Sequence, residues 1–105
     1  MTCKVEVEPS AHLQLLQLDD WWSANRPASA TRVVDAFERA IELLAETPDI
    51  GALYAVPDLS DVRRLRLAGT PYSLYYQHDA SRDVVSVLAV WSGMRGHGPI
   101  SSPRK

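Results

Sequence analysis

The hydrophobic pattern of this chain changes its period along the sequence, and that change constrains the fold more than any other feature. Between Pro9 and Pro48, apolar residues recur every three or four positions, which is the period of an amphipathic helix. After Asp61 they alternate with polar residues or run together, as they do in β-strands. A pair of helical segments followed by a group of strands indicates an α+β domain, in which helices cover one face of a sheet.

Two helices are predicted between Pro9 and Pro48. The first has Ser10 as its N-cap and ends near Ala24, whereas the second begins at the break 25–27 and is stopped by Pro48. The apolar stripes comprise Ala11, Leu15, Leu16, Leu18 and Trp22 in the first helix, and Ala30, Val33, Val34, Phe37, Ile41 and Leu44 in the second. The short connection predicts an antiparallel helical hairpin whose joint apolar face is covered by a sheet.

The strands are predicted on both sides of this hairpin. Residues 3–8 alternate as a short edge strand, and residues 49–61 lack a period and are interpreted as a long loop. Three further strands follow, over the ranges 62–67, 72–77 and 84–91. The last is apolar almost throughout, as expected of a strand buried on both faces in the middle of a sheet. The predicted order is therefore an N-terminal strand, a helical hairpin and a three-stranded antiparallel sheet.

The 105 residues correspond to one typical domain, and 46% of them are hydrophobic, which is enough for a packed core. We expect a single domain over residues 1–97 and a flexible C-terminal tail over residues 98–105. Cys3 is the lone cysteine, so the chain has no internal disulfide. Because no signal-peptide or membrane-spanning pattern is present, a cytoplasmic location is expected, without contact with a membrane.

Charge is divided unequally along the chain. Residues 1–61 contain 4 Lys/Arg against 11 Asp/Glu, whereas residues 62–105 contain 7 against 2. The overall net charge of -2 therefore conceals an acidic, helical part and a basic, strand-rich part that can meet an anionic partner.

The basic strand 62–67 supplies the first candidate contact residues. Arg64 and Arg66 alternate with leucines, which places both guanidinium groups on the face opposite the core. Arg63 falls on the leucine face, where it is expected to pair with Glu42 or Glu46. The alternative for Arg64 and Arg66 is a merely solvated strand face.

Two aromatic residues and one more arginine complete the predicted partner-binding set. Tyr75 lies on the strand face beside the arginines, Arg95 follows the last strand, and Trp21 lies off the main helical stripe. Exposed tryptophan is favoured at binding hot spots, although a second facet of the core is an equal alternative for Trp21. Tyr72 and Tyr76 are interpreted as core residues.

Motifs for independent catalysis or metal binding are absent from the sequence. It contains no glycine-rich phosphate loop, nucleophile elbow or Cys/His cluster. Cys3 has no neighbouring ligand, His12 is expected on a helix surface, and His78 is expected in the hairpin turn. Neither a metal nor a cofactor is predicted, and protein binding is the favoured type of function.

The order of the elements and several short motifs together resemble the RelE/ParE superfamily of toxins from bacterial type II toxin–antitoxin systems. The residues that carry the resemblance are Trp22 with Asn25-Arg26-Pro27, Leu44 with Pro48 and Gly51, the strands 62–67 and 72–76, and Ala89-Val90-Trp91 with Arg95-Gly96 and Pro99. The resemblance covers nearly the whole chain. The Trp-x-x-Asn-Arg-Pro junction and the Val-Trp to Arg-Gly ending are more similar to ParE-like sequences.

This resemblance implies a small toxin that is held inactive by a cognate ParD-like antitoxin. ParE-like members poison DNA gyrase, which requires a complementary protein surface, whereas RelE-like members cut messenger RNA on the ribosome. A nuclease of the second kind would use Arg64, Arg66 and Arg95 for phosphate and His97 as the proton donor. The chain departs from that pattern, because no lysine lies between residues 4 and 105, the strand 72–77 has no arginine, and no tyrosine follows residue 76.

Three functions are therefore carried forward. The leading one is a ParE-like toxin that inhibits gyrase by binding, without enzymatic activity or direct contact with nucleic acid. The second is a RelE-like ribosome-dependent endoribonuclease. The third is a relative that has lost toxicity and acts as an antitoxin-binding co-repressor.

Overall fold

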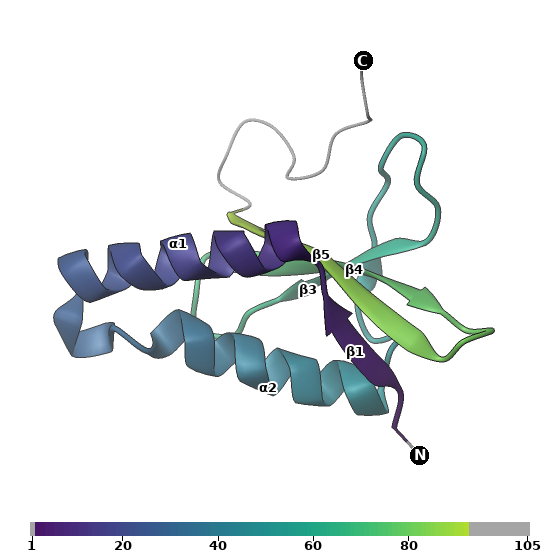
Figure 1. Cartoon of the computed structure of the whole chain (residues 1–105), viewed down its shortest axis with the longest axis horizontal. Helices are drawn as coiled ribbons and strands as arrows, with labels where there is room; N and C mark the ends of the chain where they lie inside the picture. Colours follow the sequence, from purple (N-terminus) through teal and green to yellow (C-terminus); the bar gives the residue numbers. More distant parts are fainter. Residues whose placement is uncertain (1, 93–105) are drawn as a thin grey trace.

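Two helices lie on one face of a five-stranded sheet in this structure, a computed structural model that describes residues 2–92 (Figure 1). In chain order the elements are β1 (Lys4–Val7), α1 (Pro9–Asn25), a 3-10 turn (Pro27–Ser29), α2 (Arg32–Glu46), β2 (Ala52–Leu53), β3 (Val62–Arg66), β4 (Tyr72–Asp79) and β5 (Val84–Ser92). The tail predicted over residues 98–105 lies outside the described residues. Within residues 2–92, no helix has the length and apolar character needed to cross a membrane.

The strand order across the sheet is β1-β5-β4-β3-β2. The α+β class and the antiparallel pairing of β3, β4 and β5 are confirmed, but the sheet has five strands and not three. The edge strand predicted over residues 3–8 is confirmed as β1, which joins this sheet by pairing in parallel with β5. The strand that was not predicted is β2, which lies within the expected loop 49–61 and pairs with β3. Two residues are too few to give a period, so only the pairing defines β2.

Both helices begin differently from the sequence prediction. Pro9 is already helical and Glu8 precedes it, because proline needs no hydrogen-bond acceptor for its nitrogen in the first turn. Ser10 is therefore not the N-cap, and its hydroxyl donates to the carbonyl of Leu88 in β5 (3.4 Å). The break at 25–27 leads into the 3-10 turn, so α2 begins at Arg32.

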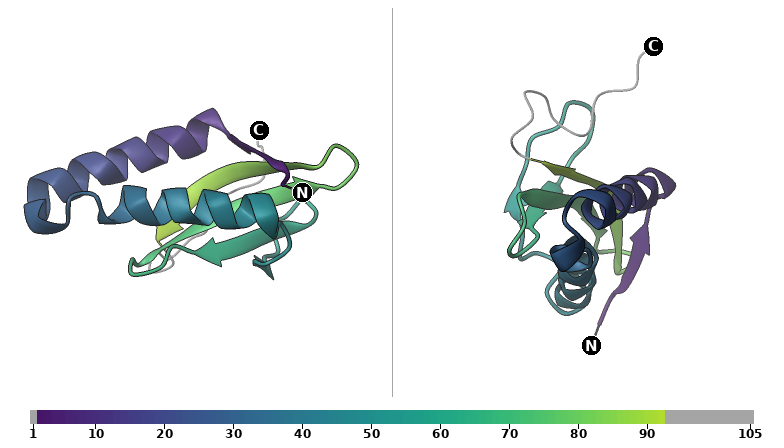
Figure 2. Two further views of the ribbon diagram at one scale, coloured as in Figure 1. Left: turned by 90° about the horizontal axis from the view of Figure 1, so that it is seen from below. Right: turned by 90° about the vertical axis from the view of Figure 1, so that its left-hand side faces the viewer.

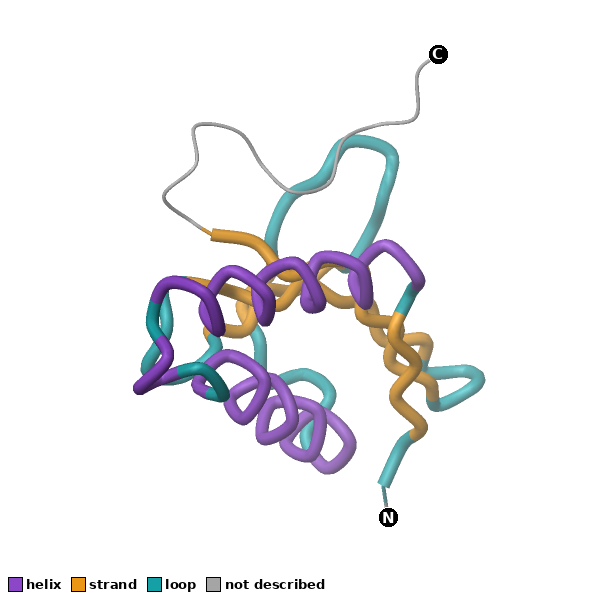
Figure 3. The backbone as a smooth tube through the Cα atoms, turned by 60° about the vertical axis from the view of Figure 1, so that its left-hand side comes forward, coloured by secondary structure: helices purple, strands orange, loops and turns teal. Residues whose placement is uncertain are grey.

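The inner core lies between the helical hairpin and the sheet. Figure 2 shows the two helices side by side, and Figure 3 shows both on the same side of the strands. The fully buried members of this core include Ala11, Val33 and Leu44 from the helices and Leu74, Tyr76, Val85 and Val87 from the sheet. The predicted stripes are confirmed at most positions, but Leu16 is 46% exposed and lies outside the core.

An extra residue in β5 couples this strand to α1. Tyr75 pairs with Ala89 while Tyr76 pairs with Val87, so Leu88 is a bulge in the β4–β5 ladder. Backbone groups around the bulge find partners on and just before α1. The N–H of Glu8 donates to Val87 (2.9 Å), and the N–H of Val90 donates to the Gln14 side-chain oxygen (2.8 Å).

We expect the Gln14→Ala variant to destabilise the fold, because it leaves the N–H of the buried Val90 without its acceptor. The cost should be about 1–3 kcal/mol in the free energy of unfolding, measured by urea denaturation. Gln17→Ala is the matched control, since Gln17 lies one turn further along α1 and makes no comparable bond to β5 among the described residues. Equal losses in the two variants would contradict this role of Gln14.

Candidate partner-binding surface

The register of the sheet places the two predicted arginines in rows across its outer face, away from the helices. Arg66 pairs with Ser73, which pairs with Trp91, and Arg64 pairs with Tyr75, which pairs with Ala89. The outer face also carries a second, smaller core that includes part of the Arg64 row. It consists of Val56, Val62, Tyr75 and Ala89, with Tyr54, Leu88 and Trp91 packed against it.

Arg64 and Arg66 are exposed, and neither forms an ion pair with a carboxylate in residues 2–92. The guanidinium carbon of Arg64 lies 5.5 Å from the centre of the Tyr54 ring, a cation–π contact that orients this side chain. The alternation of β3 thus predicted the direction of both arginines correctly. Two permanent positive charges remain available on the outer face for carboxylates or phosphates.

Arg63, in contrast, binds groups of the chain itself. Its guanidinium donates to the carbonyl of Gly51 (2.7 Å) and lies 3.9 Å from the carboxylate of Asp49. The expected pairing with Glu42 or Glu46 is wrong, because β2 brings the segment after α2 alongside the beginning of β3.

Tyr75 lies beneath the surface and not on it. Its side chain faces outward as predicted, but the residue is 2% exposed because the Tyr54 ring covers it edge-on at 4.8 Å. Burial raises the pKa of the Tyr75 hydroxyl, and the adjacent Arg64 opposes this shift only in part. Tyr75 therefore stays protonated at neutral pH and supports Arg64 from below.

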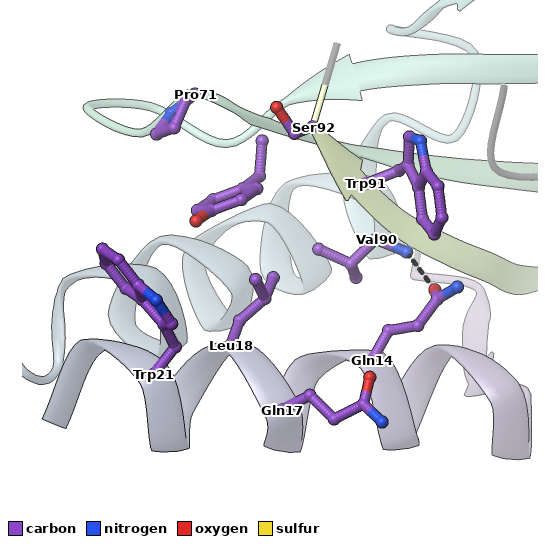
Figure 4. Close-up of a pocket in the computed structure, with 9 residues that line it drawn as sticks. Gln14, Gln17, Leu18, Trp21, Pro71, Val90, Trp91 and Ser92 are labelled. Atoms are coloured by element: carbon purple, nitrogen blue, oxygen red, sulfur yellow. Dashed lines mark hydrogen bonds between the residues drawn. The ribbon is translucent and has the colours of Figure 1, made fainter. Parts of the chain in front are cut away.

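A groove of about 490 Å³ opens between α1 and the adjoining ends of β4 and β5 (Figure 4). Its lining consists of Gln14, Gln17, Leu18 and Trp21 from α1, and Pro71, Tyr72, Val90, Trp91 and Ser92 from the strand side. Sequence reasoning missed the groove, because it depends on how far the helix stands from the strands. The polar Gln14 and Gln17 beside the apolar stripe were the signal that was available.

Trp21 forms one wall of this groove and is 48% exposed. Its ring packs edge-on against Trp22 at 5.9 Å, and the Trp22 indole N–H donates to the Tyr72 hydroxyl (3.1 Å). Of the two alternatives that the sequence left open for Trp21, the structure shows the exposed one, whereas its role as an anchor stays a prediction. An exposed indole on a fixed support loses little conformational entropy when a partner covers it.

Trp91 connects the groove with the cross-strand row that contains Arg66. Trp91 lines the groove and also lies in the same cross-strand row as Arg66, two strand spacings or about 10 Å away. We call Arg64, Arg66, Trp91 and Trp21, together with the groove, the Arg–Trp surface. Arg95 and His97, the remaining predicted site residues, lie outside the described residues.

The fold also brings together residues that the sequence did not connect. His78 lies within β4, so its expected position in the hairpin turn is wrong. It approaches Cys3 and Asp83 at the edge of the sheet where β1 joins β5. Their separation in the sequence gave no signal of this cluster.

Comparison with known proteins identifies relatives of the chain and of its fold. The family described as "ParE toxin of type II toxin-antitoxin system, parDE" matches residues 5–96. The fold is similar to that of the chromosomal ParDE toxin–antitoxin system from P. aeruginosa, with a TM-score of 0.69 and 18% identity over 87% of this chain and 96% of that chain. No curated protein matches the sequence.

Solved RelE structures share the architecture as well. A mutant of the E. coli toxin RelE in the free state has a TM-score of 0.64 and 19% identity, over 90% of this chain and 86% of that chain. The toxin–antitoxin complex RelBE2 from Mycobacterium tuberculosis has a TM-score of 0.62 and 22% identity, over 88% of this chain and 99% of that chain. These likenesses show the fold, whereas the family match spans most of the sequence. The chain therefore belongs to the ParE toxin family of type II toxin–antitoxin systems.

Proposed function

We propose that the chain is a bacterial, cytoplasmic toxin that inhibits DNA gyrase by binding, and that a cognate ParD-like antitoxin neutralises it by covering the Arg–Trp surface. The observation that carries this proposal is the pair of exposed guanidinium groups, Arg64 and Arg66, beside an apolar groove and without carboxylate partners in residues 2–92. Membership in the ParE toxin family supports a toxin, and the resemblance to ParE-like sequences supports gyrase as its target.

The chemistry of the Arg–Trp surface suits a protein segment that is acidic and carries an apolar anchor. Guanidinium groups bind carboxylates through two parallel hydrogen bonds, which gives both affinity and orientation. The groove beside Trp21 and Trp91 can bury an apolar side chain of the same segment. The similarly folded RelBE2 toxin–antitoxin complex from Mycobacterium tuberculosis adds support for an antitoxin as that partner.

A nuclease needs proton transfer in addition to positive charge. Arginine stays protonated at neutral pH, and burial raises the pKa of the Tyr75 hydroxyl, so this residue also stays protonated and supplies no base there. The two histidines in residues 2–92 lie elsewhere, with His12 exposed on α1 and His78 at the edge beside Cys3. Within residues 2–92, no histidine therefore lies beside Arg64 and Arg66, which supports binding at this surface. The proton donor of the RelE-like alternative, His97, and its third arginine, Arg95, lie outside the described residues.

The target is tested by inducing the chain in a bacterial host and by adding purified protein to isolated gyrase. We expect filamentous cells with damaged DNA and continuing translation, together with loss of gyrase supercoiling in the purified assay. Abrupt arrest of protein synthesis with cleaved transcripts would overturn gyrase in favour of the nuclease. Harmless expression of a folded protein that still binds antitoxin would instead indicate the co-repressor.

The role of the arginines is tested by measuring antitoxin affinity for the Arg64→Ala/Arg66→Ala double variant. We expect the dissociation constant to rise at least tenfold, because hydrogen bonds to charged groups each contribute about 1.5–3 kcal/mol. The salt dependence of binding should also become weaker, since two exposed charges no longer take part.

The matched control is Arg26→Ala/Arg39→Ala, which removes the same charge from two exposed positions in the helical hairpin, one at the end of α1 and one within α2. This control should change the dissociation constant little. If both double variants weaken binding equally, net charge and not the Arg–Trp surface determines antitoxin binding.

A further inference from the structure

Three side chains with metal-binding atoms meet at the edge of the sheet where β1 joins β5. The Cys3 sulfur, one imidazole nitrogen of His78 and a carboxylate oxygen of Asp83 all lie within 4.8 Å of one another. Cys3 immediately precedes β1, His78 lies in β4, and Asp83 lies in the turn between β4 and β5. The cluster therefore joins three segments that only the tertiary fold brings together.

Backbone hydrogen bonds hold these segments in place. The N–H of Cys3 donates to the carbonyl of Ala45 at the end of α2 (2.8 Å), which fixes Cys3 against the helix. The N–H of Lys4 donates to the carbonyl of Asp83 (3.2 Å), which holds the turn beside β1. His78 is fixed by its register opposite Val85. A site built on paired strands is more preorganised than one on a free loop.

The His78 ring lies between two carboxylates. Its Nε2 is 3.5 Å from Oδ1 of Asp83, and its Nδ1 is 3.5 Å from Oδ1 of Asp49. A metal-binding histidine commonly donates its second ring N–H to a carboxylate, which fixes both the tautomer and the ring orientation. Asp49 is placed to accept that hydrogen bond from Nδ1 while Nε2 faces Asp83.

The donor set and spacing suit a tetrahedral ion. Thiolate, imidazole and carboxylate together favour Zn²⁺, whereas Mg²⁺ and Ca²⁺ prefer oxygen donors alone. With Zn–N and Zn–S bonds of ordinary length, neighbouring ligand atoms lie about 3.5 Å apart. The contact between His78 and Asp83 already has this length. All three ligand atoms lie within 4.8 Å of one another, so no pair is far from the spacing that an ion would impose.

The Cys3 thiol is buried beside carboxylates, and its Sγ donates a hydrogen bond to the carbonyl of Leu44 (3.5 Å) that metal binding would replace. Burial raises the pKa of the Cys3 thiol, and the negative charges of Asp83 and Asp49 raise it further. A bound dication reverses this balance, because it neutralises the carboxylates and stabilises the thiolate.

We propose that Cys3, His78 and Asp83 bind a Zn²⁺ ion, that Asp49 orients the imidazole, and that water completes the coordination. The ion ties the N-terminal edge strand to the β4–β5 turn and to the segment after α2. This site lies apart from the Arg–Trp surface and does not depend on the proposed function.

The test is titration of the complete, untagged chain with Co²⁺, followed by displacement with Zn²⁺. Because the chain contains one cysteine, a thiolate-to-cobalt charge-transfer band reports on Cys3 alone. We expect the band to saturate at one equivalent and to disappear on addition of Zn²⁺. Cys3→Ser should abolish it, and His78→Gln, Asp83→Asn and Asp49→Asn should each weaken Co²⁺ binding about 10- to 100-fold.

His12→Gln is the matched control, since His12 is exposed on α1 and outside the cluster, and it should bind as the wild type does. Thermal unfolding gives a second readout on variants first shown to be folded, with Zn²⁺ raising Tm in wild type and His12→Gln but not in Cys3→Ser. No band with folded wild-type protein, or undiminished affinity in both His78→Gln and Asp83→Asn, would overturn the site.

Discussion

The two faces of the sheet are covered unequally, and the position of the proposed binding surface depends on this difference. The helical hairpin covers the inner face, whereas Tyr54 and Val56 from the β2–β3 segment cover only part of the outer face. β5 carries apolar side chains on both faces, so its outer face also needs to be shielded from solvent. The cross-strand row of Arg66, Ser73 and Trp91 lies on this outer face, with a charged residue at one end and an aromatic residue at the other.

The β5 bulge connects this outer face to the groove. Because Leu88 is an extra residue, Val87 and Val90 both face the helices although they are three positions apart. Trp91 consequently points away from the inner core and stands where the strand passes α1. Without the bulge the alternation would be reversed beyond residue 88, and Trp91 would be directed into the helices. The hydrogen bonds from α1 to this region thus position the proposed binding surface as well as stabilise the fold.

Periodicity predicted the features that depend on the spacing of residues within one helix or strand. It did not predict the features that depend on strand pairing or on which side chains cover a face of the sheet. The helical stripes, and the direction of Arg64 and Arg66, follow from single-element geometry. Tyr75 faces outward as alternation requires, but alternation says nothing of the Tyr54 ring that buries it. The bulge could not be predicted, because a continuous apolar run does not show which residues face which side of the sheet. The Cys3 cluster could not be predicted either, because only tertiary contacts bring its residues together.

ParDE and RelE structures share this architecture at low identity, so the fold alone does not select between gyrase and messenger RNA. The proposed function therefore depends on which groups of the outer face an antitoxin covers. Arginine-selective chemical labelling, read by mass spectrometry on the free chain and on its antitoxin complex, measures this directly. We expect Arg64 and Arg66 to react in the free chain and to be protected in the complex, while Arg26 and Arg39 stay reactive. Equal reactivity of Arg64 and Arg66 in both states would contradict it.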